Sequence, residues 1–240
     1  MEDKQQGVVI QTVKYGDTSL IVKVFTRQLG LQSYMVKGVF GKSSHNRVAL
    51  FQNLNIINFV QTGKAQTKSL GYLKDVEVAY VYHSAPFVMN KIAIMMFVSE
   101  LLSKSITGEE QNKPFYDFIV HSLQWLDLSE QGYANFPLYF SLEVCRFLGF
   151  YPKSNYAAGS FFDLMEGQYV GQAPLHPYYL EPETALLLSH CLDKGIDAIA
   201  EMPMNVRQRR ALLDGIITFM RLHAPFLKGL QSLEVLESVL

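Results

Sequence analysis

Cysteine is scarce in this chain, and its scarcity excludes two kinds of architecture. Two cysteines, Cys145 and Cys191, occur among 240 residues and cannot form a disulfide framework. The six histidines are not spaced from one another as metal ligands are, so the sequence predicts no structural zinc site. Each cysteine falls inside a helical pattern, where a small buried thiol is common.

Long hydrophobic runs are missing as well. No uncharged apolar stretch reaches the roughly 18 residues of a membrane span. The N-terminal residues 1–6 lack the basic region and apolar run of an export signal. Because 49% of the residues are hydrophobic and 18% are charged, we expect a folded globular protein of one large or two modest domains. The expected location is the cytoplasm, without membrane association.

Acidic residues are nearly absent from the front of the chain. Between residues 4 and 74 there is one acid, Asp17. The same segment carries ten basic residues: Lys4, Lys14, Lys23, Arg27, Lys37, Lys42, Arg47, Lys64, Lys68 and Lys74. Residues 81–240 hold eleven Lys/Arg and seventeen Asp/Glu, so the net charge of -1 hides a basic front and an acidic back. This asymmetry indicates a polyanionic partner for the basic part.

The basic part reads as a series of short strands. Gly16-Asp17 and Leu29-Gly30 are turn signals between alternating segments, and residues 41–47 are too polar to pack inside the protein. The expected strands are residues 8–14, 18–26, 31–40, 54–61 and 69–81. Five short strands with little helical spacing between them predict a small all-β barrel or sandwich.

Helical spacing begins at Ser84 and dominates the rest of the chain. Further helices are expected over 112–128, 132–148, 182–192 and 205–223, with a last one starting at Pro225. Residues 153–180 lack this period, and 160–163 are expected to pair with 168–170 as a β-hairpin. The fold class is therefore α+β, all-β then all-α. We expect one domain over residues 1–82 and a helical domain over 83–240, with the hairpin inserted at about 151–180.

Two motifs could indicate an enzyme, but neither supports that interpretation. Gly38 to Ser43 resembles a nucleotide-binding loop, but Val36 stands where that motif needs its first glycine, and a polar loop follows instead of a helix. Asp163 and Glu166 are adjacent to one hairpin turn, where carboxylates are usually just solvated. We find no catalytic constellation and predict no enzymatic activity, no metal and no cofactor.

The aromatic residues of the front segment are interleaved with its lysines and arginines. Bases of single-stranded nucleic acids stack on such rings while cations follow the backbone. Most of these rings are expected in the core, and Tyr15 and Phe40, next to turn glycines and lysines, are expected to be exposed. In the helical part, Arg207, Arg210 and Arg221 fall on one helix pattern beside apolar residues. Such a row suits an acidic peptide that ends in a hydrophobic residue, and an ordinary solvated face is the alternative.

Several short motifs of the front segment together resemble a known family. They are Tyr15-Gly16-Asp17-Thr18-Ser19-Leu20, Phe25-Thr26, Gly30-Leu31 and Lys37-Gly38. Their order is similar to the start of the bacterial recombination mediator RecO, in which a basic loop follows. Gly149-Phe150-Tyr151-Pro152 and Phe162-Asp163-Leu164 are similar to later steps of the family. The resemblance covers the whole chain and is strongest over residues 13–38.

This resemblance implies an N-terminal five-stranded OB barrel and a helical domain. RecO-like proteins bind single- and double-stranded DNA, anneal complementary strands, bind the acidic C-terminal tail of single-stranded DNA-binding protein, and with RecR help to load RecA. Some relatives carry four cysteines as a zinc site. Residues 151–179 contain none, so we expect a tyrosine- and proline-rich hairpin to pack there instead.

Three hypotheses follow. In the first, the chain mediates DNA recombination and repair, and its barrel contacts DNA through Lys14, Arg27, Lys37, Lys42 and Arg47, with Tyr15 and Phe40 as exposed rings. In the second, it is an OB-type adaptor that binds RNA or acidic proteins without DNA. The third, a hydrolase or transferase that uses Asp163, Glu166 or His190, has the least support.

Overall fold

The computed structural model describes residues 4–40, 47–62 and 70–239. It contains two compact units, described separately below. One comprises the first 83 residues together with residues 106–127, and the other comprises residues 84–105 and 128–240.

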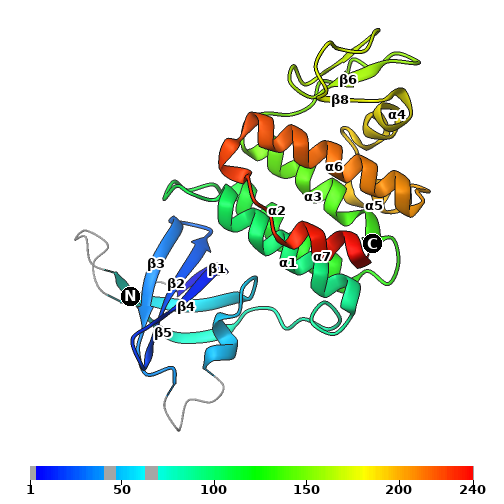
Figure 1. Ribbon diagram of the computed structural model, residues 1–240. Coiled ribbons are helices and arrows are strands. Elements are labelled where there is room, and N and C mark those ends of the chain that lie inside the picture. The colour runs from blue at the N-terminus through cyan, green and yellow to red at the C-terminus, as the bar shows by residue number, and fades with distance from the viewer. Residues whose placement is uncertain (1–3, 41–46, 63–69, 240) are drawn as a thin grey trace. The chain divides into compact units, whose positions relative to one another are not determined.

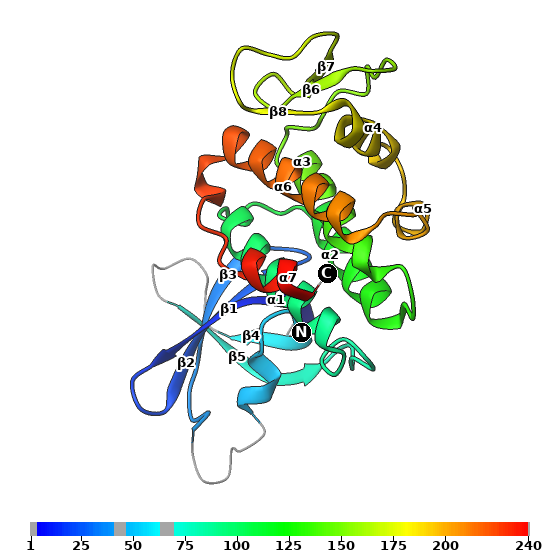
Figure 2. The same ribbon diagram turned by 45° about the vertical axis from the view of Figure 1, so that its right-hand side comes forward.

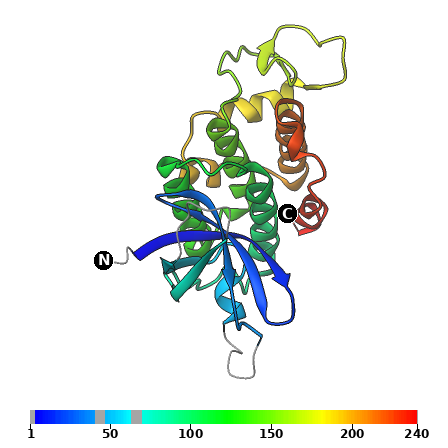
Figure 3. The same ribbon diagram turned by 90° about the vertical axis from the view of Figure 1, so that its left-hand side faces the viewer.

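The first unit contains a closed five-stranded barrel, drawn in blue to cyan in Figure 1. Its neighbours follow the order β1-β2-β3-β5-β4, which is the OB-type arrangement. The strands are β1 (Lys4–Tyr15), β2 (Ser19–Thr26), β3 (Gly30–Val36), β4 (Ile56–Thr62) and β5 (Gly71–Val78). β1 is the long deep-blue ribbon of Figure 3, and it pairs with both β2 and β4. The sequence pattern allowed either an all-β barrel or a sandwich, and the structure is a closed barrel.

The barrel core consists of inward-facing residues of the strands and of Phe51 from the short 3-10 helix η1 (Val48–Phe51). Val22, Val24 and Phe59 are fully buried. The buried Tyr34 donates its hydroxyl hydrogen bond to Gln61 Oε1 at 3.2 Å, so the one polar atom of this large ring is satisfied.

Helix α2 (Lys113–Leu128) belongs to the same compact unit as the barrel. Its buried Phe115 and Tyr116 contact the ring of Phe25 at the end of β2. Gly30 allows the chain before α2 to approach closely, because a Cβ atom there would lie 2.4 Å from the carbonyl oxygen of Glu110. Gly30 also has φ +68°, a value that favours glycine.

The second unit is mainly helical. Its helices are α1 (Met89–Ser105), α3 (Phe136–Phe147), α4 (Pro182–Cys191), α5 (Ile196–Ala200), α6 (Val206–His223) and α7 (Ser232–Val239), with the 3-10 turns η2 (Tyr133–Asn135) and η3 (Pro225–Leu227). α6 packs on α3, and α7 packs on α1 (Figure 2). The start of α6 has a capping box, in which the Asn205 side chain accepts from the Gln208 backbone and Gln208 caps Asn205 in return.

A three-stranded sheet is inserted between α3 and α4. It consists of β6 (Phe161–Asp163), β7 (Gln168–Val170) and β8 (Tyr179–Leu180), in the order β7-β6-β8. Aromatic contacts join it to α6, because Phe162 and Phe150 both meet the ring of Phe219. At the outer edge of β7, the Asn155 side-chain amide exchanges two hydrogen bonds with the Tyr169 backbone, at 3.1 and 3.2 Å.

The predicted order of a barrel followed by helices is confirmed, as is the hairpin of β6 and β7. The third strand β8 and the short helix α5 were not predicted. The expected helix at Pro225 was wrong, because a single 3-10 turn forms there and α7 begins only at Ser232. Both cysteines are buried. Within the described ranges, no helix is long and apolar enough to cross a membrane.

Candidate nucleic-acid interface

One outer face of the barrel carries a row of apolar side chains across four strands. The strand register aligns Val13 of β1 with Ile21 of β2, Ile21 with Met35 of β3, and Met35 with Tyr72 of β5. Paired residues of neighbouring strands point to the same side of a sheet. Because Val22, Tyr34 and Leu73 point into the core, the residues beside them point outward. We call Val13, Ile21, Met35 and Tyr72 the apolar row.

Lysines lie on both sides of the apolar row. Lys23 is exposed on β2, two positions beyond Ile21, and Lys37 is exposed just after β3, two positions beyond Met35. The Lys37 ammonium lies over the Tyr72 ring, with Nζ 5.0 Å from the ring centroid. In the part of the chain that the structure describes, Lys23 and Lys37 form no ion pair. Their charges therefore face solvent beside an apolar surface.

A second pair of lysine and ring lies at the end of β1. Lys14 Nζ is 5.3 Å from the centroid of the Phe40 ring, and Phe40 is 42% exposed. The register through Leu20 connects Lys14 to Val36, and both Leu20 and Val36 are buried in the core, so Lys14 does not share the side of the apolar row. This pair lies at the end of the barrel, next to the end of β3 that bears Lys37. Tyr15 is exposed beside it. Arg47 is exposed directly before η1, and Lys42 lies outside the described residues.

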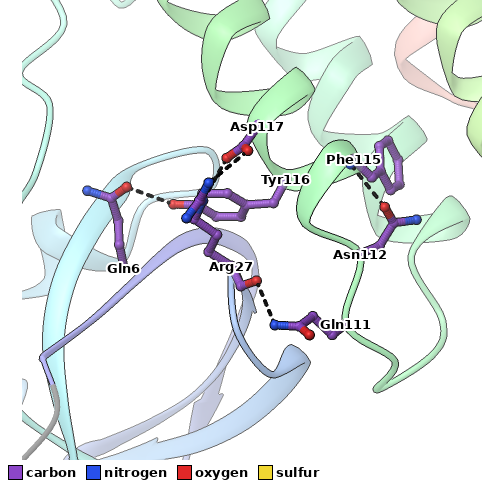
Figure 4. Close-up of polar contacts among 7 residues, drawn as sticks. All are labelled: Gln6, Arg27, Gln111, Asn112, Phe115, Tyr116 and Asp117. Atoms are coloured by element: carbon purple, nitrogen blue, oxygen red, sulfur yellow. Dashed lines mark hydrogen bonds and ion pairs between the residues drawn. The ribbon is translucent and has the colours of Figure 1, made fainter.

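Arg27 lies apart from these groups. Its guanidinium makes a two-point ion pair with Asp117 of α2, at 2.8 and 3.0 Å (Figure 4). The hydrogen bond from Arg27 is the main reason that the pKa of Asp117 is below its ordinary value. Arg27 follows the end of β2 and is six positions along the chain from Ile21, a distance of about 20 Å along a strand. Arg27 thus joins α2 to the barrel, and the structure does not group it with the lysines beside the apolar row.

Tyr15 and Phe40 were predicted to be the two exposed rings of the front segment and are exposed, but Tyr72, which was not selected, is exposed as well. Tyr72 is 42% exposed. Alternation in β5 could have identified it, since Leu73 is the inward residue and Tyr72 and Lys74 flank it. The alternation of β2 likewise places Lys23 on this face, which the sequence interpretation did not select.

The three arginines proposed for an acidic peptide lie along α6. Arg207 is exposed in the first turn, and Arg210 donates to the backbone carbonyl of Glu237 in α7. Arg221 is in the last turn, where its Nε is buried and has no hydrogen-bond partner among the described residues. Eleven residues separate Arg210 from Arg221, which is about 16 Å along a helix. The three side chains therefore form a row and do not converge on one pocket.

The Asp163 carboxylate of the insertion has structural partners. One oxygen of Asp163 accepts hydrogen bonds from the backbone of Met165 and Glu166, at 2.8 and 3.0 Å, and the other lies 3.3 Å from His176 Nε2. These contacts stabilise the turn between β6 and β7. The described residues contain no group of three or more His, Cys, Asp or Glu that is arranged to hold a metal ion.

Comparison with known proteins identifies relatives along the whole chain. Two family models match, described as "Recombination protein O N terminal" over residues 1–82 and "Recombination protein O C terminal" over residues 87–231. The protein named "DNA repair protein RecO" of Flavobacterium psychrophilum is 36% identical over 242 residues, which covers 100% of this chain and 99% of that one. The proteins of the same name from Phocaeicola vulgatus and Bacteroides fragilis are 32% and 33% identical, over 240 and 241 residues, with the same coverage.

Proposed function

Since this chain belongs to the RecO family of DNA repair proteins, we propose that it is a recombination mediator that binds DNA on the outer face of its barrel. It anneals complementary strands and helps to load RecA on single-stranded DNA that is coated by single-stranded DNA-binding protein. The observation that carries this proposal is the apolar row with exposed lysines beside it and exposed rings under two ammonium groups.

Charge supplies the affinity in this mechanism. Lys14, Lys23, Lys37 and Arg47 are exposed and face solvent, so each can approach a phosphate without first breaking an ion pair among the described residues. Binding then releases counterions from the DNA, and affinity falls with salt. Lys42, which lies outside the described residues, joins this set in the proposal. Neutralising two strands on one surface lowers their mutual repulsion, which favours annealing.

Arg27 contributes little to DNA binding in this proposal. To contact a phosphate, its guanidinium would have to leave both oxygens of Asp117. Two-point arginine–carboxylate pairs are strongly oriented, so a new partner gains little over the old one. The first hypothesis named Arg27 with the lysines, and the geometry favours a structural role for it instead.

The acidic tail of single-stranded DNA-binding protein is the proposed partner of α6. An extended peptide advances about 3.3 Å per residue, so about five residues separate the positions of Arg210 and Arg221. Arg207 would extend this path at the start of the helix. RecR is the further proposed partner, and RecA is reached indirectly through the mediator complex.

The first experiment measures binding of a fluorescent single-stranded oligonucleotide by anisotropy, between about 50 and 200 mM salt. The variants are Lys37→Gln combined with Lys23→Gln, and Arg27→Gln as the matched loss of one barrel cation. We expect the double variant to weaken binding and to flatten the dependence on salt, because each lost phosphate contact reduces the slope by about one. Arg27→Gln should change the affinity and its dependence on salt far less.

Binding that is independent of salt would contradict the proposal. So would a loss of affinity in Arg27→Gln that matches the loss in the double variant. If DNA binding is absent while an acidic tail peptide still binds, the chain is the protein adaptor of the second hypothesis.

A further inference from the structure

We infer that each lysine–ring pair of the barrel is a single-nucleotide subsite, in which the ring receives a base and the lysine moves from the ring to a phosphate. The pairs are Lys37 with Tyr72, on the apolar row, and Lys14 with Phe40, at the adjacent end of the barrel. This inference rests on the proposed function and adds a preference to it: the barrel face selects single strands over duplex DNA.

The rings of both pairs are accessible from solvent. Tyr72 and Phe40 are each 42% exposed, and in the free protein a lysine ammonium lies 5.0 and 5.3 Å from their respective centroids. An ammonium over an exposed ring contributes a factor of about two to five in equilibrium terms. A stacked base contributes a factor of about 5 to 150. A base can therefore replace the ammonium, and the displaced lysine remains beside the same nucleotide.

The length of the apolar row fits a single strand of several nucleotides. Val13 and Tyr72 are separated by three strand-to-strand steps, which is about 14 Å. The rise per nucleotide along one strand of a duplex is about 3.4 Å, so a single DNA strand laid across the apolar row spans several nucleotides. Ile21 and Met35, in the middle of the row, are partly exposed and offer further apolar surface to bases.

Duplex DNA can contact only part of this surface. Duplex DNA presents phosphates outward and keeps its bases stacked inside, so it can engage Lys23 and Lys37 but cannot place a base on Tyr72. The lysines then serve both forms of DNA, and the rings and the apolar row serve only single strands. The rings therefore determine the preference for single strands over duplex DNA, and the lysines determine how strongly the affinity depends on salt.

The test compares three probes of equal phosphate number on the full chain: a short single strand, an abasic single strand of the same length, and a duplex of half that length. Tyr72→Leu and Phe40→Leu keep apolar volume and remove the stacking surface. Phe226→Leu is the matched control, because Phe226 is 53% exposed in the helical unit. Anisotropy gives affinities across salt, and urea unfolding verifies that each variant folds.

We expect the intact chain to bind the base-bearing single strand at least about fivefold more tightly than the abasic strand. Tyr72→Leu should remove most of this advantage while leaving duplex affinity and the salt slope unchanged, and Phe226→Leu should retain it. Equal affinity of the intact chain for base-bearing and abasic strands would overturn the inference and leave the proposed function standing. An equal loss for single strand and duplex in Tyr72→Leu would overturn it as well. Absence of binding to all three probes would instead refute the proposed function itself.

Discussion

Glu100 of α1 holds the start of α7, and replacing it with glutamine should loosen this helix. One carboxylate oxygen accepts from the backbone of Gln231 at 3.0 Å, and the other accepts from the backbone and hydroxyl of Ser232 at 2.8 and 2.6 Å. These donors are groups that a helix N-terminus leaves unsatisfied. Glu100→Gln keeps the shape but leaves one acceptor oxygen and no charge.

The magnitude follows from the bonds that are lost. Hydrogen bonds to charged groups contribute about 1.5–3 kcal/mol and neutral ones about 1 kcal/mol. The variant loses at least one bond and the charge assistance of the others. Since Glu100 is only partly buried, solvent screening reduces the total, and we expect a loss of about 2 kcal/mol in the free energy of unfolding. For a chain of this size that corresponds to a decrease of about 4–8 °C in Tm.

The effect should depend on pH in one direction. Burial raises the pKa of Glu100, but the hydrogen bonds from Ser232 and Gln231 outweigh it, so the pKa of the folded state is below its ordinary value. A lowered pKa contributes stability that is fully present above the unfolded value of about 4.3 and is lost as the pH falls through the folded value. The difference between wild type and Glu100→Gln should therefore shrink in acid.

Urea unfolding followed by circular dichroism measures the difference at neutral pH and at about pH 4. Glu130→Gln, at an exposed position, is the matched control and should have little effect. Equal stability of wild type and Glu100→Gln at neutral pH would show that the hydrogen bonds from Gln231 and Ser232 to Glu100 do not stabilise the protein. If the stability difference between wild type and Glu100→Gln is the same in acid as at neutral pH, the negative charge of Glu100 is not its source.

Two further predictions concern the glycines and the thiols. Gly30→Ala should destabilise the chain far more than Gly16→Ala. Both glycines have positive φ, but the new Cβ atom would clash with the Glu110 backbone at Gly30 and would meet nothing within 4 Å at Gly16. Thermal unfolding of the two variants tests this difference in stability. Burial raises the pKa of both thiols, that of Cys191 to about 12, so neither Cys145 nor Cys191 should react with a thiol reagent until urea unfolds the chain, and rapid labelling of the folded chain would contradict this.

Local patterns predicted the barrel well because its strands alternate strongly and its turns carry glycine. The same alternation predicts that Tyr72 points outward, but the sequence does not show that Tyr72 lies beside Met35 on the neighbouring strand. That contact depends on a parallel pairing between β3 and β5, whose residues are far apart in the chain. Register across such a gap is a property of the closed barrel.

Arg27 shows a second limit of sequence reasoning. In the sequence it is one of ten cations in a basic segment, and nothing nearby distinguishes it from Lys23. Its partner Asp117 is 90 residues away, on a helix that the sequence assigned to the other part of the chain. The three arginines of α6 were placed on one helix correctly, but their periodicity does not show that Arg210 already contacts Glu237.

The Asn155 amide at the edge of β7 has a consequence for self-association. Exposed strand edges recruit strands from other molecules, because their free N–H and C=O groups act as a template. Here a side chain supplies both the donor and the acceptor that an incoming strand would offer to Tyr169. The small sheet is thereby closed to growth at this residue, which protects the protein from pairing through this edge with other copies of itself.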